Sequence, residues 1–389
     1  MNPIIPSILD TDHYKITMGQ VVFNQFPNAL VRYEFINRGK TSFPPGFDKA
    51  LRAQIQMMAA LRLAGEEAQW YRDAVRYLKP TYIEWLQGYR FNPDEVTITQ
   101  EGGDLRVTIE GPWYRTILWE VSLLSLISEL YYRLSGIEPD AEWEQRAEQK
   151  AKRMAHAGLH WIDFGSRRRF SLTVQEEVNI RMKAFPGLFL GSSNPYICKR
   201  HGLTPMGTFA HEGPMAMQSL YGPRMCSRIW MDAWVREYNG DLGIALTDTL
   251  TTPVFLRYFD MFHAKLFDGV RIDSGDPVEV AEMVLAHYDS MNIPTRSKRF
   301  VFSDSLDDER AIALHRRFSD RCMVTAGIGT FLTNDCGARP LNMVIKLVAA
   351  DLGVGFHDLV KLSDDIGKHT GQTSAIELCQ RDLGLVGRK

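Results

Sequence analysis

Residues 207–214 read GTFAHEGP and contain His211, whose imidazole has the widest chemical use of any side chain near neutral pH. An apolar run leads into this stretch and a long helical pattern starts near Pro214. We therefore expect His211 at the carboxyl end of a strand, on the loop before a helix, where α/β sheets carry their functional side chains. A histidine there can act as base, proton donor or nucleophile, and Glu212 can hold a ring nitrogen or a neighbouring group. A single histidine is more often structural, so this hypothesis needs support from other motifs.

A second motif, RIDSGD at 271–276, ends another apolar run. Arg271 and Asp273 are two residues apart and so lie on the same side of a strand. Ser274 and Gly275 supply a tight turn with free backbone N–H groups. A capped turn into the helix after Pro277 would explain the same residues, but the density of charge at a strand end favours a functional site.

Three consecutive arginines, Arg167, Arg168 and Arg169, stand in the segment FGSRRRF. A guanidinium group binds two oxygens of a phosphate or a carboxylate at once. Arginines at the amino end of a helix also oppose the helix dipole, which a bound anion would relieve. The alternative is a solvated helix face, and we expect an anion-binding role for one or two of the three.

A glycine-bearing turn, GIGT, contains Gly327, Gly329 and Thr330. Glycines let a backbone approach an anion closely, and the late loops of barrels often bind phosphate. An ordinary turn explains GIGT equally well. The segment GSSN, which contains Ser193 and Asn194, is also a weak signal by itself.

The segment DTDHYK at 10–15 groups titratable side chains at the start of a predicted helix. Capping of that helix explains Asp12 fully. It explains neither Tyr14 nor Lys15.

The composition excludes several classes of function. The 389 residues carry a net charge of −2 and are 45% hydrophobic, so no basic field would hold nucleic acid or an anionic membrane. Five scattered cysteines form no CxxC pair, which suits a reducing cytosol and predicts a cytoplasmic location. The sequence shows no signal peptide, no His/Cys metal cluster, no P-loop and no GxSxG motif. We therefore predict no metal-ligand set, and any use of ATP requires another kind of phosphate site.

The elements that must position these motifs begin with a mixed α+β region over residues 1–135. A helix capped by Thr11 or Asp12 should run to about residue 26, and the alternating segment 30–37 should form a half-buried strand. Segments 95–99 and 105–110 predict a hairpin, and 113–134 predicts one long buried helix.

From residue 136 to 339 short apolar runs alternate with helical stretches, which predicts parallel strands joined by helices. The spacing favours an irregular (β/α) barrel over a Rossmann sheet, because no GxGxxG follows the first strand. Two more strands, at 343–348 and 359–362, should pair with the N-terminal sheet. We thus predict an α/β fold in which 136–339 forms the barrel with the active site, and 1–135 and 340–389 together form a smaller α+β domain. The runs taken as barrel strands are 161–164, 188–190, 205–209, 242–246, 269–272, 300–302 and 323–326.

An ordered set of motifs spans nearly the whole chain: DTDHYK, FGSRRRF, GSSN, GTFAHE, VRIDSGDP, FSDSLD, GIGTFLTND and NMVIKLV. Together they resemble the nicotinate phosphoribosyltransferase family, most closely its bacterial members. Two positions depart from the pattern. Gly213 stands where a bulky residue is expected after the HE pair, and Pro195 stiffens the loop after GSSN.

The resemblance implies a reaction that joins nicotinate to 5-phosphoribosyl 1-pyrophosphate, giving nicotinate mononucleotide and pyrophosphate for NAD biosynthesis, coupled to ATP hydrolysis. It implies that His211 is transiently phosphorylated and that Mg²⁺ assists the departing pyrophosphate. It places Asp273 near the ribose or the metal. Arg271, with Arg167 or Arg168, would hold the nicotinate carboxylate or a phosphate.

The remaining substrate contacts follow from the same resemblance. Tyr14 would stack on or border the pyridine ring, from another domain or a second subunit, and Gly327, Gly329 and Thr330 would take the 5-phosphate. The substrate-binding set is completed by Ser193, Asn194, Thr208, Ser274 and Gly275. Nicotinamide or quinolinate as the acceptor, and a catalytically silent binding protein on the same scaffold, are the competing hypotheses. The expected partners are small molecules, with neither nucleic acid nor membrane, and a homodimer is left open.

Overall fold

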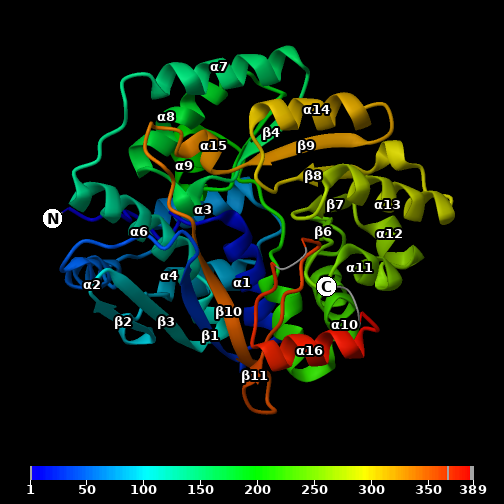
Figure 1. The fold of residues 1–389 in the computed structure, drawn as a ribbon, viewed down its shortest axis with the longest axis horizontal. Coiled ribbons are helices and arrows are strands. Elements are labelled where there is room, and N and C mark those ends of the chain that lie inside the picture. The colour runs from blue at the N-terminus through cyan, green and yellow to red at the C-terminus, as the bar shows by residue number, and fades with distance from the viewer. Residues whose placement is uncertain (1, 366–367, 386–389) are drawn as a thin grey trace.

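Two β-sheets organise the chain, and a computed structural model gives their arrangement for residues 2–365 and 368–385 (Figure 1). One sheet is parallel, with strand order β5-β4-β9-β8-β7-β6, and the other is antiparallel, with order β11-β10-β1-β3-β2. The predicted mixed α/β architecture is confirmed at this level. The bounds of the strands are β1 Leu30–Asn37, β2 Val96–Glu101, β3 Asp104–Pro112, β4 His160–Asp163, β5 Phe189–Ser192, β6 Ile244–Leu246, β7 Gly269–Ile272, β8 Arg299–Phe302, β9 Met323–Ile328, β10 Met343–Asp351 and β11 His357–Asp358.

The antiparallel sheet combines strands from both ends of the chain. β1 occupies the predicted positions, and β10 pairs with it along its whole length, with one register shift between Arg32 and Tyr33. The predicted pairing of the tail with the N-terminal sheet is therefore confirmed. The strand predicted at 359–362 is wrong, because there only Lys361 forms a β-bridge, to Thr370. The neighbouring backbone groups bond instead to Thr249 and to the side chain of Gln218.

The parallel sheet contains six of the seven predicted runs. The run at 205–209 is not a strand: Pro205 bridges Ser192 and the segment then leaves the sheet. Gly207 packs so closely on the first turn of α1 (His13–Gln25) that an added Cβ would lie 3.1 Å from the Tyr14 nitrogen. The predicted irregular barrel is not confirmed, since β5 and β6 remain the two edges of this sheet among the described residues.

Helices surround both sheets, with α7, α13 and α14 over the parallel sheet in Figure 1. The predicted helix over 113–134 is interrupted after Thr116, so α5 and α6 are separate helices. α10 is kinked where Gly222 adopts φ 70° before Pro223. The remaining bounds are α2 Phe47–Met58, α3 Gly65–Ala74, α4 Pro80–Gly88, α5 Trp113–Thr116, α6 Trp119–Ser135, α7 Trp143–His156, α8 Leu172–Met182, α9 Pro195–His201, α10 Glu212–Tyr238, α11 Thr252–Tyr258, α12 Met261–Leu266, α13 Pro277–Ser290, α14 Asp308–Phe318, α15 Thr330–Thr333 and α16 Thr373–Asp382, with short 3₁₀ turns at Pro93–Glu95, Ser166–Arg168 and Thr295–Ser297.

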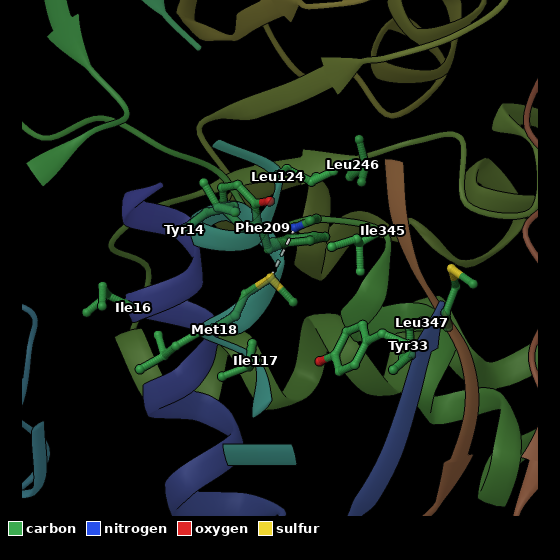
Figure 2. Close-up of a cluster of buried hydrophobic side chains, with 14 of the residues drawn as sticks. Tyr14, Ile16, Met18, Tyr33, Ile117, Leu124, Phe209, Leu246, Ile345 and Leu347 are labelled. Atoms are coloured by element: carbon green, nitrogen blue, oxygen red, sulfur yellow. Dashed lines mark hydrogen bonds between the residues drawn. The ribbon is translucent and has the colours of Figure 1, made fainter. Parts of the chain in front are cut away.

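A shared hydrophobic core fixes the segment that leads to His211. Phe209 is 1% exposed and belongs to the same core as Met18 of α1 and Ile345 of β10 (Figure 2). The backbone N–H of Ala210 donates to the Met18 sulfur at 3.2 Å. Truncating a buried phenylalanine typically costs about 3–5 kcal/mol, so this packing holds the loop in one position.

Among the described residues, no helix combines the length and the apolar character needed to cross a membrane.

Candidate active site

A cavity of about 270 Å³ lies where the loops that follow β4, β7, β8 and β9 face β10 of the antiparallel sheet. Side chains at the carboxyl ends of parallel strands meet at one edge of the sheet, so this is the expected place for a functional site. The predicted site residues that line it are Tyr14, Arg167, Arg168, Ser193, Thr208, His211, Arg271, Asp273, Ser274, Gly329 and Thr330.

Three predicted site residues do not line this cavity. Asn194 caps α9 and donates to a carboxylate oxygen of Asp10 at 2.8 Å. Gly275 makes a turn at φ 77°, and Gly327 packs so tightly that an added Cβ would lie 2.4 Å from the Phe164 ring. These three residues shape the loops around the cavity, and a direct contact between them and a substrate stays a prediction.

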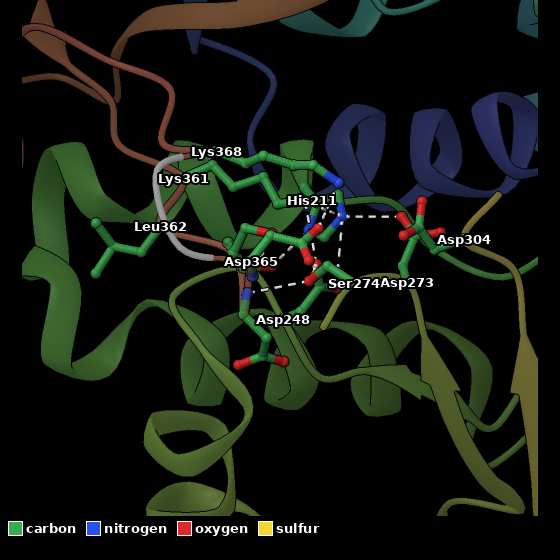
Figure 3. A network of polar contacts seen from close by, with 12 residues as sticks. His211, Asp248, Asp273, Ser274, Asp304, Lys361, Leu362, Asp365 and Lys368 are labelled. Atoms are coloured by element: carbon green, nitrogen blue, oxygen red, sulfur yellow. Dashed lines mark hydrogen bonds and ion pairs between the residues drawn. The ribbon is translucent and has the colours of Figure 1, made fainter. Parts of the chain in front are cut away.

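His211 is the N-cap residue of α10, so its place on the loop before a helix agrees with the prediction. The strand predicted before it is absent, because 206–210 is irregular. The side chain of His211 is 10% exposed, and its Nε2 lies 2.9 Å from Lys361 Nζ and 3.2 Å from Asp273 Oδ2 (Figure 3). Its Nδ1 lies 3.2 Å from the Thr249 hydroxyl.

Electrostatics favour the neutral form of His211. The pKa of the imidazole is lowered to about 4, chiefly by burial; the Asp248 and Asp273 carboxylates oppose this shift and the Lys361 charge contributes to it. The ring therefore keeps an unprotonated nitrogen at neutral pH. An unprotonated imidazole nitrogen is what a base or a nucleophile requires.

Glu212 was expected to hold either a ring nitrogen of His211 or a neighbouring group. It does not contact the imidazole. Its carboxylate accepts hydrogen bonds from Trp113 Nε1 at 2.7 Å, from the Tyr33 hydroxyl and from the Lys15 ammonium. All of these donors come from the N-terminal part of the chain. Glu212 thus anchors the first turn of α10 and, through it, the backbone of His211.

The departure at Gly213 has a packing explanation. A Cβ added at Gly213 would lie 2.2 Å from the Trp230 ring, which occupies the space that a larger residue would need. The indole of Trp230 is fully buried. Trp230 of the same helix therefore fills the space beside Gly213 that a larger residue after the HE pair would occupy.

Arg271 and Asp273 form one rigid unit. The guanidinium lies 2.9 Å from Asp273 Oδ1 and donates to the hydroxyls of Ser303 at 2.8 Å and Thr208 at 3.2 Å. Ser303 in turn donates to Asp273 at 2.6 Å. Burial opposes ionisation of Asp273, but the Arg271 charge holds the pKa of this carboxyl well below its ordinary value. An ionised aspartate therefore sits beside the imidazole at any physiological pH.

The three consecutive arginines divide between two tasks. Arg169 is fully buried and pairs with both oxygens of Asp10, at 2.5 and 2.7 Å, so it is structural. Arg167 and Arg168 line the cavity. The Arg167 guanidinium lies 5.4 Å from the centre of the Tyr14 ring, a distance at which a cation interacts with the ring face. Arg167 and Arg168 are thus placed where an anion could bind, and an anion-binding role for them stays a prediction.

The prediction that capping of the helix explains Asp12 in the DTDHYK segment is wrong. It occupies the N-cap position of α1, but its side chain makes no capping hydrogen bond. Its carboxylate accepts from the Ser193 hydroxyl at 2.5 Å and lies 3.6 Å from the Arg167 guanidinium. Asp12 therefore orients two other cavity residues.

Several cavity residues were missed from the sequence. Lys361 and Lys368 come from the C-terminal segment, Arg38 follows β1, and Lys346 lies on β10 within the quoted segment NMVIKLV. Burial lowers the pKa of Lys346 to about 7, with Lys361 adding to the effect. The signal available was a lysine inside an otherwise apolar strand, which is costly unless the amine has a use.

Comparisons with known proteins agree with the geometry. A family model described as the nicotinate phosphoribosyltransferase (NAPRTase) family matches residues 159–384, and a model of the N-terminal domain of that family matches residues 9–128. The chain is 44% identical to a nicotinate phosphoribosyltransferase of Chromohalobacter salexigens, over 99% of this chain and 100% of the relative. It is 43% identical to one of Desulforapulum autotrophicum, over 98% and 99% of the two chains.

Solved structures give the same result. A crystal structure of nicotinate phosphoribosyltransferase from Porphyromonas gingivalis matches with a TM-score of 0.96 and 41% identity, over 98% of this chain and 100% of that chain. One from Vibrio cholerae matches with a TM-score of 0.91 and 32% identity, over 98% and 94% of the two chains. Models for both halves, full-length relatives and full-length structures agree, and the chain belongs to the nicotinate phosphoribosyltransferase family.

Proposed function

We propose that this enzyme joins nicotinate to 5-phosphoribosyl 1-pyrophosphate, giving nicotinate mononucleotide and pyrophosphate in the salvage route to NAD. The observation that carries the proposal is the agreement between full-length family membership and one cavity lined by Arg167, Arg168 and Arg271. Both substrates are anions, and guanidinium groups in the cavity wall suit them.

The test is an assay of the purified chain with nicotinate, nicotinamide and quinolinate at equal concentration. Nicotinate should give pyrophosphate and a mononucleotide identified by mass spectrometry. Nicotinamide lacks the carboxylate that the arginines would bind, and quinolinate carries a second carboxylate that demands a denser basic pocket. Preference for either alternative acceptor would reject the substrate assignment. Absence of pyrophosphate with all three would favour a silent binding protein.

The bond-making step needs stabilisation of positive charge on the ribose and departure of an anion. The pyridine nitrogen attacks ribose C1, the bond from C1 to the pyrophosphate oxygen breaks, and pyrophosphate leaves with the electron pair. Asp273, kept ionised by Arg271, would face the oxocarbenium-like ribose. Gly329 and Thr330, at the start of α15, would take the 5-phosphate.

The pyridine ring would lie against Tyr14, which reaches the cavity from α1 of the same chain. The Arg167 guanidinium lies 5.4 Å from the centre of the Tyr14 ring. It is therefore close enough to bind the carboxylate of a pyridine ring that lies beside Tyr14. Arg168 and Arg271 then remain for phosphate groups. Changing Arg167 to Gln should raise the KM for nicotinate more than the KM for 5-phosphoribosyl 1-pyrophosphate, and an equal rise in both would reject this division.

ATP coupling would act through phosphorylation of His211. The support is a neutral imidazole that lines the substrate cavity. Added phosphoryl charge can order the surrounding loops, so that ATP favours product formation without entering the bond between ribose and pyridine. We predict that His211→Ala loses ATP stimulation but keeps slow ATP-independent transfer, whereas His156→Ala, an exposed histidine outside the cavity, behaves like the parent. Full ATP stimulation in His211→Ala would reject the coupling role.

Mg²⁺ would enter with the pyrophosphate group, because this ion usually binds one or two carboxylates together with substrate phosphates. Asp304 fits that part. It lines the cavity, and burial raises the pKa of its carboxyl, with Asp273 adding to the effect, which a cation would relieve. When bound, the ion would neutralise charge on the leaving group.

Three broader expectations also stay proposals. The chain would work as two parts, an irregular barrel over 136–339 and a smaller domain from 1–135 and 340–389, and the shared sheet of β1 and β10 supports that division. A homodimer and a cytoplasmic location remain predictions. Light scattering of the purified chain would test the first of these two.

A further inference from the structure

Lys361 is a buried cation that the reaction described above does not use. Its Nζ lies 2.9 Å from His211 Nε2 and 3.1 Å from Asp248 Oδ2, and its side chain is 10% exposed. In Figure 3 it points toward His211 from the C-terminal segment. An ammonium group has three donors and no acceptor, so the neutral imidazole and the carboxylate are suitable partners.

The fold holds Lys361 by its backbone neighbours on both sides. Val360 exchanges two hydrogen bonds with the side-chain amide of Gln218, at 2.7 and 3.2 Å. The N–H of Leu362 donates to the carbonyl of Thr249 at 3.0 Å. The base of the lysine is therefore fixed, and only its side chain can change partners. Such anchoring is unusual for a lysine that serves as a solubilising surface group.

The charges around His211 explain why a cation is needed there. Asp273 Oδ2 and Asp248 Oδ1 lie 3.2 and 3.6 Å from the imidazole Nε2. Ligand atoms of these three residues all lie within 4.8 Å of one another, a spacing that suits a cation. A phosphoryl group carries a charge of about −1.5 to −2 at neutral pH, so it would be repelled by both carboxylates. Arg271 is bound to Asp273 at 2.9 Å, whereas Lys361 Nζ lies 2.9 Å from the imidazole Nε2, so Lys361 is placed to face the new charge.

We propose that Lys361 is a positioning residue for the phosphohistidine: it holds the imidazole of His211 before phosphoryl transfer and binds the transferred group afterwards. This inference rests on the proposed function. In the step, an imidazole nitrogen gives its electron pair to the γ-phosphorus of ATP and a P–N bond forms. The bond from phosphorus to the bridging oxygen breaks, ADP leaves with that electron pair, and the ring proton stays on the other nitrogen. Lys361 then donates to a phosphoryl oxygen and offsets the repulsion from Asp248 and Asp273.

The test compares Lys361→Met, which removes the charge, with Lys361→Arg, which keeps it. Lys265→Met removes an exposed lysine outside the cavity and is the matched control. Each full-length variant is incubated with ATP labelled in the γ-phosphate, and the acid-labile phosphate bound per chain is measured beside ATP-independent formation of nicotinate mononucleotide. Lys361→Gln is a second neutral variant in case the Met variant does not fold.

We expect the neutral variants to hold about tenfold less phosphoenzyme than the parent, the size expected for losing a charged hydrogen bond, with a smaller loss of ATP-independent transfer. Lys361→Arg should recover most of the phosphoenzyme. The inference is overturned if the neutral variants are phosphorylated normally, if Arg does not rescue, or if both activities fall equally. Absence of label in the parent and in Lys265→Met would instead overturn the proposed phosphohistidine, and this inference with it.

Discussion

Two adjacent residues, His211 and Glu212, stand in opposite polar environments. The carboxylate of Glu212 is held by an indole, a phenol and an ammonium, all from the N-terminal 113 residues, and it is 6% exposed. A fully satisfied buried network of this kind is rigid. The carboxylate therefore serves as an anchor for the first turn of α10.

The two charged partners of the His211 imidazole also pair with other charged side chains. Lys361 also contacts Asp248, and Asp273 also contacts Arg271. One carboxylate oxygen of Asp248 is buried without a hydrogen-bond partner. Glu212 is therefore fixed, whereas His211 lies 3.6 Å from a carboxylate oxygen without a hydrogen-bond partner and can change its bonding, as a transiently modified histidine requires.

The largest effect that would sharpen this comparison is on stability. Lys15→Met would leave the buried carboxylates of Glu212 and Glu120 without the ammonium group that contacts both of them. Breaking a buried ion pair by removing one partner costs about 3–5 kcal/mol. Urea unfolding should show this loss for Lys15→Met and a smaller loss for Lys361→Met. Equal losses would mean that the two networks do not differ in kind.

A smaller effect is expected at Gly213, two residues after the histidine. Gly213→Ala puts a methyl group where the Trp230 ring lies, and overpacking of this kind costs about 1–3 kcal/mol. Gly88→Ala is a matched control, because nothing lies within 4 Å of its added Cβ. In thermal unfolding, the midpoint temperature should fall for Gly213→Ala but not for Gly88→Ala. If the two midpoints are the same, Gly213 does not set the position of α10.

The smallest effect is expected in the pH dependence of His211 phosphorylation, whose rate should be nearly constant between neutral pH and pH 5.5. For a histidine with the ordinary pKa of 6.5, the fraction in the neutral form falls to about one tenth by about pH 5.5. Burial lowers the pKa of His211 to about 4, so the neutral, nucleophilic form persists as pH falls and is lost only near that lower value. The initial rate of labelling by γ-labelled ATP, measured by rapid quenching, should therefore change little down to pH 5.5. A decline centred near 6.5 would contradict the burial of this ring.

The elements set by local pattern were predictable. β1 was predicted over 30–37 because its side chains alternate between apolar and polar, and the hairpin of β2 and β3 was predicted from the segments 95–99 and 105–110. The carboxyl-end location of Arg271 and Asp273 followed from an apolar run ending in charge. Local periodicity and turn chemistry act over a few residues, so a single sequence contains them.

The failures depend on contacts between distant residues. The run at 205–209 has the composition of a strand but packs on Tyr14, almost 200 residues earlier in the chain. Arg169 and Arg167 look alike in the sequence, and only the position of Asp10 and Tyr14 separates the structural arginine from the cavity arginine. Lys361 reaches His211 from 150 residues away. No local pattern records these pairings.

The most direct test of the central claim is to locate the phosphate that ATP leaves on the enzyme. The parent chain is treated with γ-labelled ATP, digested at a pH that preserves phosphohistidine, and the labelled peptide is sequenced by mass spectrometry. We predict about one phosphate per chain, carried by the imidazole of His211. A label on another residue, or ATP-stimulated synthesis of the mononucleotide with no label on His211, would contradict it.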